Sequence, residues 1–418
     1  MKIKMDHVSR TEGHMGFVSH IVDGRVEKAQ LATQEGARLF EGILTGRRYY
    51  EVGEITQRIC GVCPVIHGVT ALKAVENALG VKVTPETVLL RKMILLGQTI
   101  QSHTLHLYFL SLPDFLDFQN DLKMVAKYPE RSRQMLALRD FGNKLIALIG
   151  GRTVHPVSLK VGGFTKYPEP GVIRNFSKQI GKLLPIAKEL ASVFAQLSYP
   201  QFNRETEYLA LQQKDEYAFY DGDLGSSVNK KIPAKKFLND IRETQQPFNL
   251  VKSVDRRGQP FMVGALARLN LNHANLSEEA KAALDLSPIK LPDYNPFHNV
   301  MAQAVEVVHC LEEVVRLAKL YSQAKNGRVA AAVKVRAGRG VGAGEAPRGT
   351  LYHEYTLDDR GAITACNIIT PTAQFLFNIE KDLNEYLPRL KGKSLPDQKK
   401  EIRKMIRAYD PCISCATH

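Results

Sequence analysis

The chain has 418 residues, of which 44% are hydrophobic and 24% are charged, and its formal net charge is +14. This composition is typical of a globular protein and excludes an intrinsically disordered chain, which would carry far fewer apolar residues. The sequence starts without the apolar core of a signal peptide and has no uninterrupted apolar run of about 18 residues, so neither secretion nor a membrane span is expected.

The positive charge is compatible with an acidic protein partner, an acidic membrane surface or nucleic acid. Lys and Arg are scattered, with local clusters in "NKKIPAKKF" and "RLKGKSLPDQKKEIRKMIR". No aromatic ladder or zinc-finger spacing accompanies these clusters, which favours a solvated or partner-facing surface over a nucleic-acid interface.

Sequence periodicity predicts strands first and helices later. The first 55 or so residues alternate between apolar and polar positions and predict a short antiparallel sheet with a turn at Asp23–Gly24. Apolar residues spaced by three and four then predict helices, the first of which ends at Gly80. These helices cover residues 63–79, 84–112, 171–197 and 299–322. Long amphipathic helices of this kind can pack as a bundle.

The last part of the chain returns to strand chemistry. "VRAGRGVGAGEAPRGT" (335–350) has too many glycines for a helix and predicts a structured loop. "GTLYHEYTLDDRGAITACNIITP" (349–371) predicts strands with a polar turn at 358–361. We therefore expect an α+β fold in a single domain, residues 1–418. Its parts are an N-terminal β segment to about 55, a helical core at about 63–325, and a C-terminal loop, strand and metal-ligand segment at about 326–418.

Four of the six cysteines form two CxxC pairs, Cys60 with Cys63 and Cys412 with Cys415. In a chain without a signal peptide, such pairs indicate metal or redox chemistry more often than structural disulfides. The pairs lie near opposite ends of the sequence, so the whole chain must fold around one centre if they share it. Four thiolates suit zinc, iron or nickel, and a closed zinc site or a redox pair stays open as an alternative.

Other motifs surround these pairs. "RICGVCPVIH" and "DPCISCATH" match RxCGxCxxxH and DPCxxCxxH, and through them the chain resembles the large, catalytic subunit of [NiFe]-hydrogenases, most like the cytoplasmic, cofactor-coupled group 3 type. "SRTEGH", "LFEGILTGR", "HPVSLKVGG", "EAPRGTLYH" and "NIITPT" recur in the family's order, so the similarity covers essentially the whole chain. The resemblance implies the large-subunit fold and reversible heterolytic activation of H₂ at a Ni–Fe centre whose iron bears CO and cyanide.

The resemblance also implies ligand roles. Cys60 and Cys412 would be terminal nickel thiolates, and Cys63 and Cys415 would bridge nickel and iron. His67 would donate a hydrogen bond to a bridging sulfur.

Further roles concern protons and substrate. Glu12 would accept the first proton from a terminal thiolate, and Arg348, Pro347 and Asp410 would roof the open metal face. Without the motif, Glu12 would be an ordinary strand-turn carboxylate and Arg348 a loop salt-bridge partner. One departure is Ser102, which stands where membrane-type members carry an Asp, and which puts an Asp–Arg contact in doubt. His103, His106 and His155 are expected to be satisfied core or groove histidines.

A second cation is implied near the end of the sequence. Glu41 and His418 would hold magnesium or another divalent cation, helped by a backbone carbonyl near Asn367. In this family a precursor tail is removed after the motif's histidine, so His418 is expected to end a mature form, and a gene that ends there is the alternative. A maturation endopeptidase and nickel-insertion factors would be partners of a precursor.

The chain lacks the means to pass electrons on by itself. It has no third cysteine cluster, no GxGxxG and no P-loop. The resemblance therefore implies an iron–sulfur small subunit, with diaphorase or other electron-transfer subunits leading to NAD(P), ferredoxin or F420 in the cytoplasm. A non-catalytic, quinone-binding homologue of complex I and a structural zinc protein are the competing hypotheses, and the four cysteines argue against the first of these.

Overall fold

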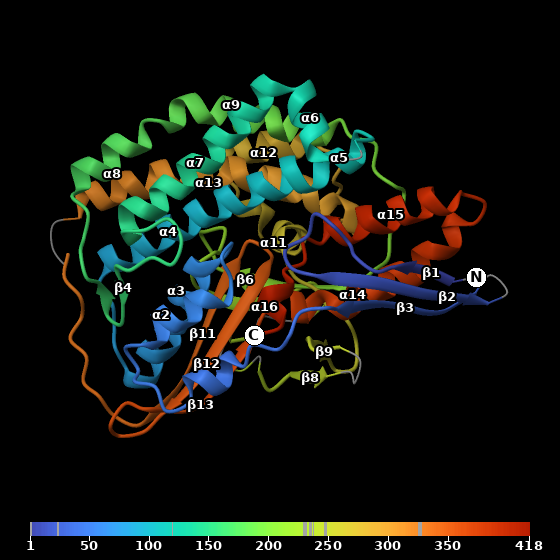
Figure 1. Ribbon diagram of the computed structural model, residues 1–418. Helices are drawn as coiled ribbons and strands as arrows, with labels where there is room; N and C mark the ends of the chain where they lie inside the picture. Colours follow the sequence, from blue (N-terminus) through green and yellow to red (C-terminus); the bar gives the residue numbers. More distant parts are fainter. Residues whose placement is uncertain are drawn as a thin grey trace.

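Long helices gather on one side of the molecule and small sheets on the other (Figure 1). The computed structural model describes residues 2–22, 25–118, 120–228, 232–233, 236, 238–245, 249–324 and 328–418. The helices are α1 (Phe40–Leu44), α2 (Val52–Thr56), α3 (Pro64–Leu79), α4 (Pro85–Thr104), α5 (Leu112–Phe115), α6 (Asp121–Lys127), α7 (Pro129–Gly150), α8 (Pro170–Ser177), α9 (Ile180–Ala195), α11 (Ala265–Asn272), α12 (Glu278–Asp285), α13 (Asn299–Gln323), α14 (Pro371–Tyr386), α15 (Leu395–Ala408) and α16 (Ile413–Ala416).

The strands pair into small, mostly antiparallel sheets. Their orders are β1-β2-β3, β10-β6-β7, β11-β12-β13, β4-β5 and β8-β9, with β10 and β6 parallel. The strands are β1 (Lys2–Met5), β2 (Met15–Val22), β3 (Arg25–Thr33), β4 (Leu159–Lys160), β5 (Gly163–Phe164), β6 (Glu207–Gln212), β7 (Asp223–Ser226), β8 (Ile241–Gln245), β9 (Lys252–Arg256), β10 (Phe261–Met262), β11 (Gly338–Ala346), β12 (Gly349–Leu357) and β13 (Ile363–Ile369).

Three of the four predicted helices are confirmed. α3 begins with Pro64 in its first turn and ends at Gly80, which adopts the left-handed conformation (φ 69°). The second corresponds to α4 and the π-helical turns that follow it to Ser111, and the third to α13. The single helix predicted over 171–197 is wrong, because the structure has two helices there, α8 and α9, which are separated at Lys178–Gln179.

Two C-terminal helices escaped the sequence analysis. α14 and α15 lie within the segment that was expected to hold loops and strands, and each has a proline in its first turn. A proline there suggests a break, but its fixed φ is compatible with the start of a helix.

The N-terminal sheet is confirmed but is shorter than predicted. β1, β2 and β3 form an antiparallel sheet, and the predicted Asp23–Gly24 turn lies outside the described residues. Residues 40–44 and 52–56 are helical, so the β segment ends at Thr33 rather than near residue 55.

The predicted Gly-rich loop is instead strand β11, whose glycines allow it to lie against α3. A Cβ added at Gly338, Gly340 or Gly342 would fall under 3.0 Å from backbone atoms of α3. Because alternate strand residues share a face, glycine at every second position removes all side chains from the contact. The β12 and β13 strands and their turn are confirmed.

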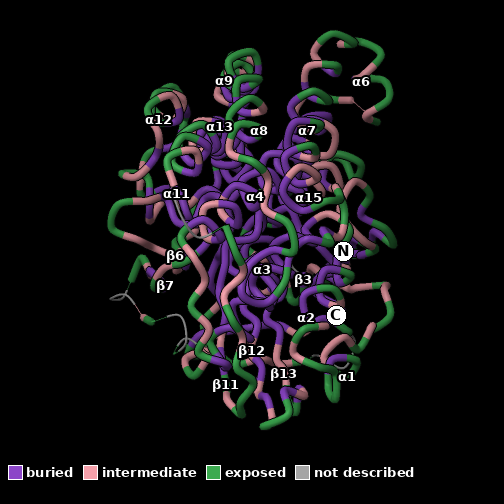
Figure 2. Tube along the Cα trace, turned by 90° about the vertical axis from the view of Figure 1, so that its left-hand side faces the viewer, coloured by how far each residue is buried: buried purple, intermediate pink, exposed green. Residues whose placement is uncertain are grey.

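Helix α3 lies at the centre of the molecule (Figure 2). It is buried along nearly its whole length and contacts α2, α4, β11 and β12. The fold is α+β, as predicted. Among the helices that the structure describes, none combines the length and apolarity needed to cross a membrane.

We expect Gly340→Ala to destabilise the protein by about 1–3 kcal/mol, because the added methyl would collide with the α3 backbone. Gly181→Ala is the matched control, since a Cβ at Gly181 meets open space near the start of α9. Thermal and denaturant unfolding would measure both variants. Equal unfolding midpoints for Gly340→Ala and the wild type would contradict the close packing.

Candidate metal centre

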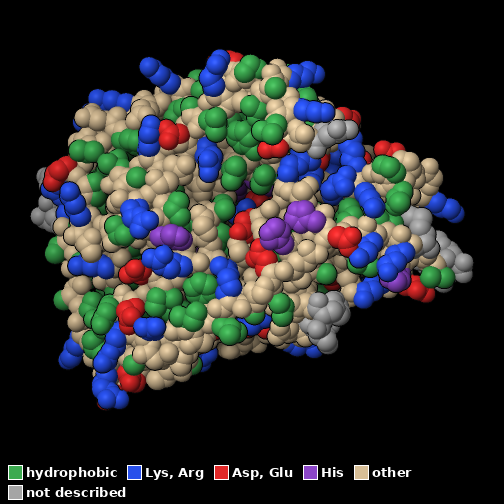
Figure 3. All heavy atoms as spheres, in the orientation of Figure 1, with side chains coloured by type: hydrophobic (Ala, Val, Ile, Leu, Met, Phe, Trp, Pro, Cys, Tyr) green, Lys and Arg blue, Asp and Glu red, His purple; other side chains and the backbone are tan. Residues whose placement is uncertain are grey.

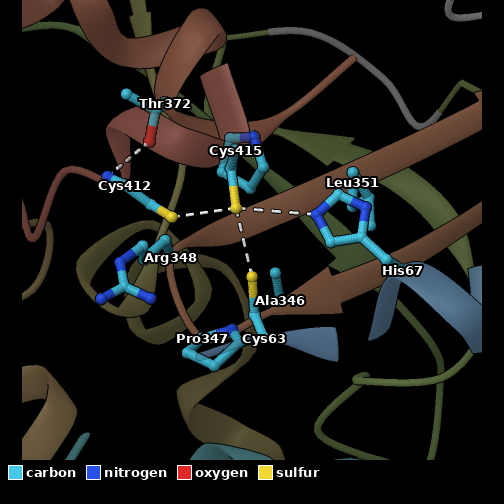
Figure 4. A pocket seen from close by; sticks show the side chains of 10 residues that line it. Cys63, His67, Ala346, Pro347, Arg348, Leu351, Thr372, Cys412 and Cys415 are labelled. Carbon is cyan, nitrogen blue, oxygen red and sulfur yellow. Dashed lines mark hydrogen bonds between the residues drawn. The ribbon is translucent and has the colours of Figure 1, made fainter. Parts of the chain in front are cut away.

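Four cysteine side chains from the two ends of the sequence meet at one point. Cys63 precedes the first turn of α3, Cys412 precedes α16, and Cys415 lies within α16. The Sγ atoms are 3.5 Å apart for Cys60 and Cys412, 3.2 Å for Cys63 and Cys415, and 2.9 Å for Cys412 and Cys415. All four lie within 4.8 Å of one another, and Figure 4 shows three of the sulfur atoms converging.

The chemistry of this donor set suits a soft or borderline metal. All four thiols are buried. Burial raises the pKa of Cys412 and Cys415, whereas hydrogen bonding with Cys412 lowers the pKa of Cys60. Thiolates this close would repel one another, and bound cations would relieve that repulsion while displacing the remaining protons. The four cysteines therefore fit a thiolate-bound metal centre.

The second cysteine pair is fixed by backbone hydrogen bonds from its own segment. The amide of Cys412 donates to the hydroxyl of Thr372 in the first turn of α14, at 3.0 Å. The amide of Ile413 donates to the carbonyl of Glu12 at 2.9 Å. Thr372 lies in the "NIITPT" motif, but the motif alone gave no reason to assign it this contact.

Arg38 joins the two cysteine segments. Its guanidinium donates to the carbonyl of Ile59 at 2.5 Å and to the carbonyl of Ser414, and its backbone amide donates to the carbonyl of Thr417 at 3.0 Å. Ile59 and Ser414 each directly precede a cysteine of the cluster. The sequence analysis missed Arg38 because no spacing links it to either pair.

Glu12 lies beside the cluster. The thiol of Cys412 donates to its Oε2 at 3.0 Å, and the amide of Ser414 donates to the same oxygen at 3.1 Å. The Ser414 hydroxyl donates to Oε1. Because Glu12 is only half-buried, its carboxylate stands between a buried thiol and solvent.

Arg348 projects from the tight turn between β11 and β12. Its Nε donates to the carbonyl of Asp410 and its Nη2 to Oδ1 of Asp410, both at 2.8 Å. Gln303 donates to Oδ2 of the same carboxylate at 3.1 Å. In the part of the chain that the structure describes, neither Nη1 of Arg348 nor the hydroxyl of Ser102 has a hydrogen-bond partner.

A small cavity adjoins the cluster. Its volume is about 10 Å³, close to the least space that one water molecule requires. Its lining residues are Cys63, His67, Ala346, Pro347, Arg348, Leu351, Pro371, Thr372, Cys412 and Cys415. A space of this size would admit only a very small substrate.

The histidines named from the sequence fall into two groups. Nε2 of His67 lies 3.6 Å from Sγ of Cys415, and burial lowers the pKa of His67 to about 3. His103 and His106 are buried and bond to Glu306 and Gln303 respectively. His155 is half-buried near the segment that precedes Cys60, where it interacts with the backbone of Gln57.

Glu41 and His418 lie close to each other near the end of β13. His418 Nε2 is 3.8 Å from Oε1 of Glu41 and 2.9 Å from the carbonyl of Ile368, while its Nδ1 is 2.7 Å from the carbonyl of Cys415. The carbonyl that lies beside His418 is that of Ile368, the residue next to Asn367. A neutral ring can donate to only one of these carbonyls, so Nε2 needs either a second proton or a cation beside it.

The charge around Glu41 favours its ionised form. Burial raises the pKa of Glu41, but the neighbouring His418, a hydrogen bond from the Ile368 amide and the charge of Lys252 lower it to about 2. Lys252 Nζ lies 3.0 Å from Oε2 of Glu41. The carboxylate is therefore available to a cation at neutral pH.

Comparison with known proteins matches the chain to the family described as nickel-dependent hydrogenase, over residues 38–137 and 199–418. The chain is 33% identical to the alpha subunit of sulfhydrogenase 1 of Pyrococcus furiosus, over 100% of this chain and 98% of that protein. It is 32% identical to the alpha subunit of sulfhydrogenase 2 of the same organism, over 100% of this chain and 99% of that protein.

The fold is shared with solved structures. An NAD⁺-reducing [NiFe]-hydrogenase, solved in the H₂-reduced state, matches with a TM-score of 0.90 and 26% identity, over 100% of this chain and 99% of that chain. The Ni-Fe-Se hydrogenase of D. vulgaris Hildenborough, also in a reduced state, matches with a TM-score of 0.79 at 23% identity, over 100% of each chain, and this likeness concerns the fold alone.

We expect Arg38→Met to loosen the second cysteine pair, because the variant loses the cation that bridges the carbonyls of Ile59 and Ser414. Amide exchange of residues 410–418 should become faster, and metal retention during purification should fall. Arg47→Met is the control, since the exposed side chain of Arg47 pairs with Glu51 at the surface. Unchanged exchange and metal content in Arg38→Met would contradict the bridging role.

Proposed function

The chain belongs to the nickel-dependent hydrogenase family, and from this premise we propose how its residues divide the work of a hydrogenase catalytic subunit. The protein is an oxidoreductase that activates H₂ at a nickel–iron centre. The observation that carries the proposal is the meeting of all four cysteines at one buried point. A quinone-binding homologue without these cysteines would lack this cluster, and a zinc protein would not require the family's remaining motifs.

Each cysteine has a proposed part in holding the metals. Cys60 and Cys412 would hold nickel, and Cys63 and Cys415 would hold nickel and iron together, with CO and cyanide as the further ligands of the iron. All four Sγ atoms lie within 4.8 Å of one another, which supports a shared metal pair. When bound, the metal pair supplies the heterolytic splitting of H₂ and takes up its electrons.

The protein's own residues would then move the proton outward. Sγ of Cys412 accepts a proton and passes it over 3.0 Å to Oε2 of Glu12. The amide and hydroxyl of Ser414 hold the carboxylate in place. Because Glu12 is half-buried, it can deliver the proton to water.

Arg348, Pro347 and Asp410 would shape the substrate side. Asp410 orients the guanidinium through two hydrogen bonds. Burial lowers the pKa of Arg348, but Asp410 and the neighbouring thiolates raise it by more, so the arginine keeps its charge. Pro347 lines the cavity, and its carbonyl accepts a hydrogen bond from Arg268 at 2.9 Å. A fixed cation beside the cavity would stabilise negative charge that develops during the reaction.

Glu41, His418 and the carbonyl of Ile368 would hold magnesium. The Glu41 carboxylate, Nε2 of His418 and the Ile368 carbonyl lie close together. A cation bound at Nε2 would remove the need for a second proton on the His418 ring. Magnesium prefers carboxylate, carbonyl and water ligands, which supports this choice. Elemental analysis of the purified protein for magnesium would test it.

Electrons would leave through an iron–sulfur small subunit to a cytoplasmic carrier such as NAD(P), ferredoxin or F420, by way of diaphorase or other electron-transfer subunits. A relative of this chain is the beta subunit of the NAD-reducing hydrogenase HoxS of Cupriavidus necator. Figure 3 shows Lys and Arg side chains spread among apolar and acidic ones over one face, which supports contact with protein partners rather than nucleic acid. H₂-dependent reduction of each carrier by the assembled complex would identify the acceptor. If the protein is made as a precursor, an endopeptidase and nickel-insertion factors would act before assembly.

We expect Cys63→Ser and Cys415→Ser each to abolish H₂ oxidation and to lose nickel and iron together, because a hydroxyl is a far poorer ligand for soft metals than a thiolate. Elemental analysis and H₂-oxidation assays measure both effects. Cys366→Ser is the matched control, because Cys366 lies outside the cluster. Native metal content with native turnover in either cluster variant would exclude the bridging role, and zinc alone in the wild type would exclude the function.

We expect Glu12→Gln to assemble the metal centre but to lower H₂ turnover and H/D exchange by roughly 10²–10⁴-fold, because an amide keeps the shape but cannot relay a proton. Glu35→Gln is the control, since Glu35 is a nearby carboxylate that accepts from the His14 amide instead. Reduction of the partner's clusters by a chemical reductant should stay normal. Native turnover would move the proton route elsewhere, and loss of nickel would make Glu12 structural.

A further inference from the structure

Three buried side chains form a row of hydrogen bonds that leads away from the cysteine cluster. His67 Nε2 lies 3.6 Å from Sγ of Cys415, and His67 Nδ1 lies 3.3 Å from Nε2 of His353. Nδ1 of His353 then lies 2.7 Å from the hydroxyl of Tyr355. His353 and Tyr355 are two residues apart on β12, so they share the strand face that looks toward α3. Figure 4 shows the ring of His67 directed at Cys415.

We propose that the Tyr355 hydroxyl, acting through His353, sets the tautomer of His67 so that this ring donates an N–H to the sulfur of Cys415. Tyr355 and His353 are thus positioning residues for the metal centre. The inference rests on the proposed function only in taking Cys415 as a metal ligand.

Both histidines in the row are neutral. Both rings are buried, where a charged imidazole is costly, and Nδ1 of His67 and Nε2 of His353, which lie 3.3 Å apart, cannot both carry a proton. A neutral imidazole carries one N–H donor and one acceptor nitrogen. The proton on each ring therefore has only two possible positions, and the neighbours decide between them.

The direction of the row is decided at Tyr355. The tyrosine is fully buried, and in the described part of the chain the partner of its hydroxyl is Nδ1 of His353. If the hydroxyl donates to Nδ1, its proton is satisfied. If His353 donated instead, the phenolic proton would be buried without an acceptor, which is costly. Tyr355 is therefore the donor.

The remaining protons follow from this first one. Nδ1 of His353 accepts from the hydroxyl, so its proton is on Nε2 and is donated to Nδ1 of His67. His67 then carries its own proton on Nε2, which faces the sulfur. The opposite order would place a nitrogen lone pair against the thiolate. The Tyr355 hydroxyl, two rings away, thus decides whether His67 donates a hydrogen bond to the sulfur of Cys415 or turns a repelling lone pair toward it.

The hydrogen bond matters because donors to a ligating sulfur tune the metal. They withdraw electron density from the thiolate and stabilise the more reduced state, so they raise the reduction potential. If the hydrogen bonds from Tyr355 to His67 lose their fixed direction, the reduction potential of the metal centre should therefore fall, although every ligand remains.

The test uses the full chain assembled with its partner, labelled with ¹⁵N-histidine, in metal-free and metal-loaded forms. Long-range ¹H–¹⁵N spectra should show His67 and His353 as Nε2–H tautomers in the wild type. In Tyr355→Phe, the Nδ1–H forms of both rings should become populated. The loaded variant should keep its nickel and iron, while its nickel EPR signal titrates at a lower potential.

Two further variants separate positioning from packing. Tyr352→Phe makes the same change at another buried tyrosine of β12 and should leave the tautomers unchanged. His353→Gln keeps an acceptor for Tyr355 and a donor for His67, so it should retain the Nε2–H form of His67, and a change to the Nδ1–H form in this variant would contradict the relay through His353.

The proposal would be overturned by a wild-type His67 protonated on Nδ1, or by tautomers that Tyr355→Phe leaves unchanged. Because the spectra are also recorded without metal, the outcome does not depend on activity. A wild type that bound nickel yet failed to oxidise H₂ would refute the proposed function alone.

Discussion

The closure of one very long loop governs the architecture of the molecule. The sulfur atoms of Cys60 and Cys412 lie 3.5 Å apart although 352 residues separate them in sequence. Four thiol groups gathered in a buried site form only weak hydrogen bonds with one another, so the scaffold must hold them there. Thr372, Glu12 and Arg38 do this by binding the backbone of the second cysteine pair.

The contact between α3 and the β11–β12 hairpin transmits this constraint to the rest of the site. The glycines of β11 allow backbone to meet backbone, so the strand can vary little in position against the helix. The helix carries His67 and begins directly after Cys63, whereas the hairpin carries Arg348 at its turn and His353 on β12. A single packing interface therefore sets the positions of Cys63 and His67 relative to Arg348 and His353.

Local signals in the sequence were sufficient for part of this description. Pro64 and Gly80 mark the ends of α3, and the CxxC pairs with their motifs identify the cluster. The alternating glycines of β11 did not predict a strand. A strand is recognised from the alternation of apolar and polar side chains, and glycine has no side chain. The contacts of Arg38 and the direction of the Tyr355 row join segments far apart in the chain, and no spacing rule can connect them. Ser102 was recognised in the sequence as a departure from the motif, but the absence of a hydrogen-bond partner for its hydroxyl among the described residues was not.

The separation of the two cysteine pairs also has a consequence for biosynthesis. During translation the first pair is made long before the second, and until α16 docks it offers only two sulfur atoms. Two thiolates bind a metal ion far less securely than four, so early capture of an unsuitable ion by the nascent chain is disfavoured. Contacts between such distant residues are also slow to form, because much chain entropy must be lost first. Four sulfur ligands are therefore available to a metal ion only after the scaffold has formed.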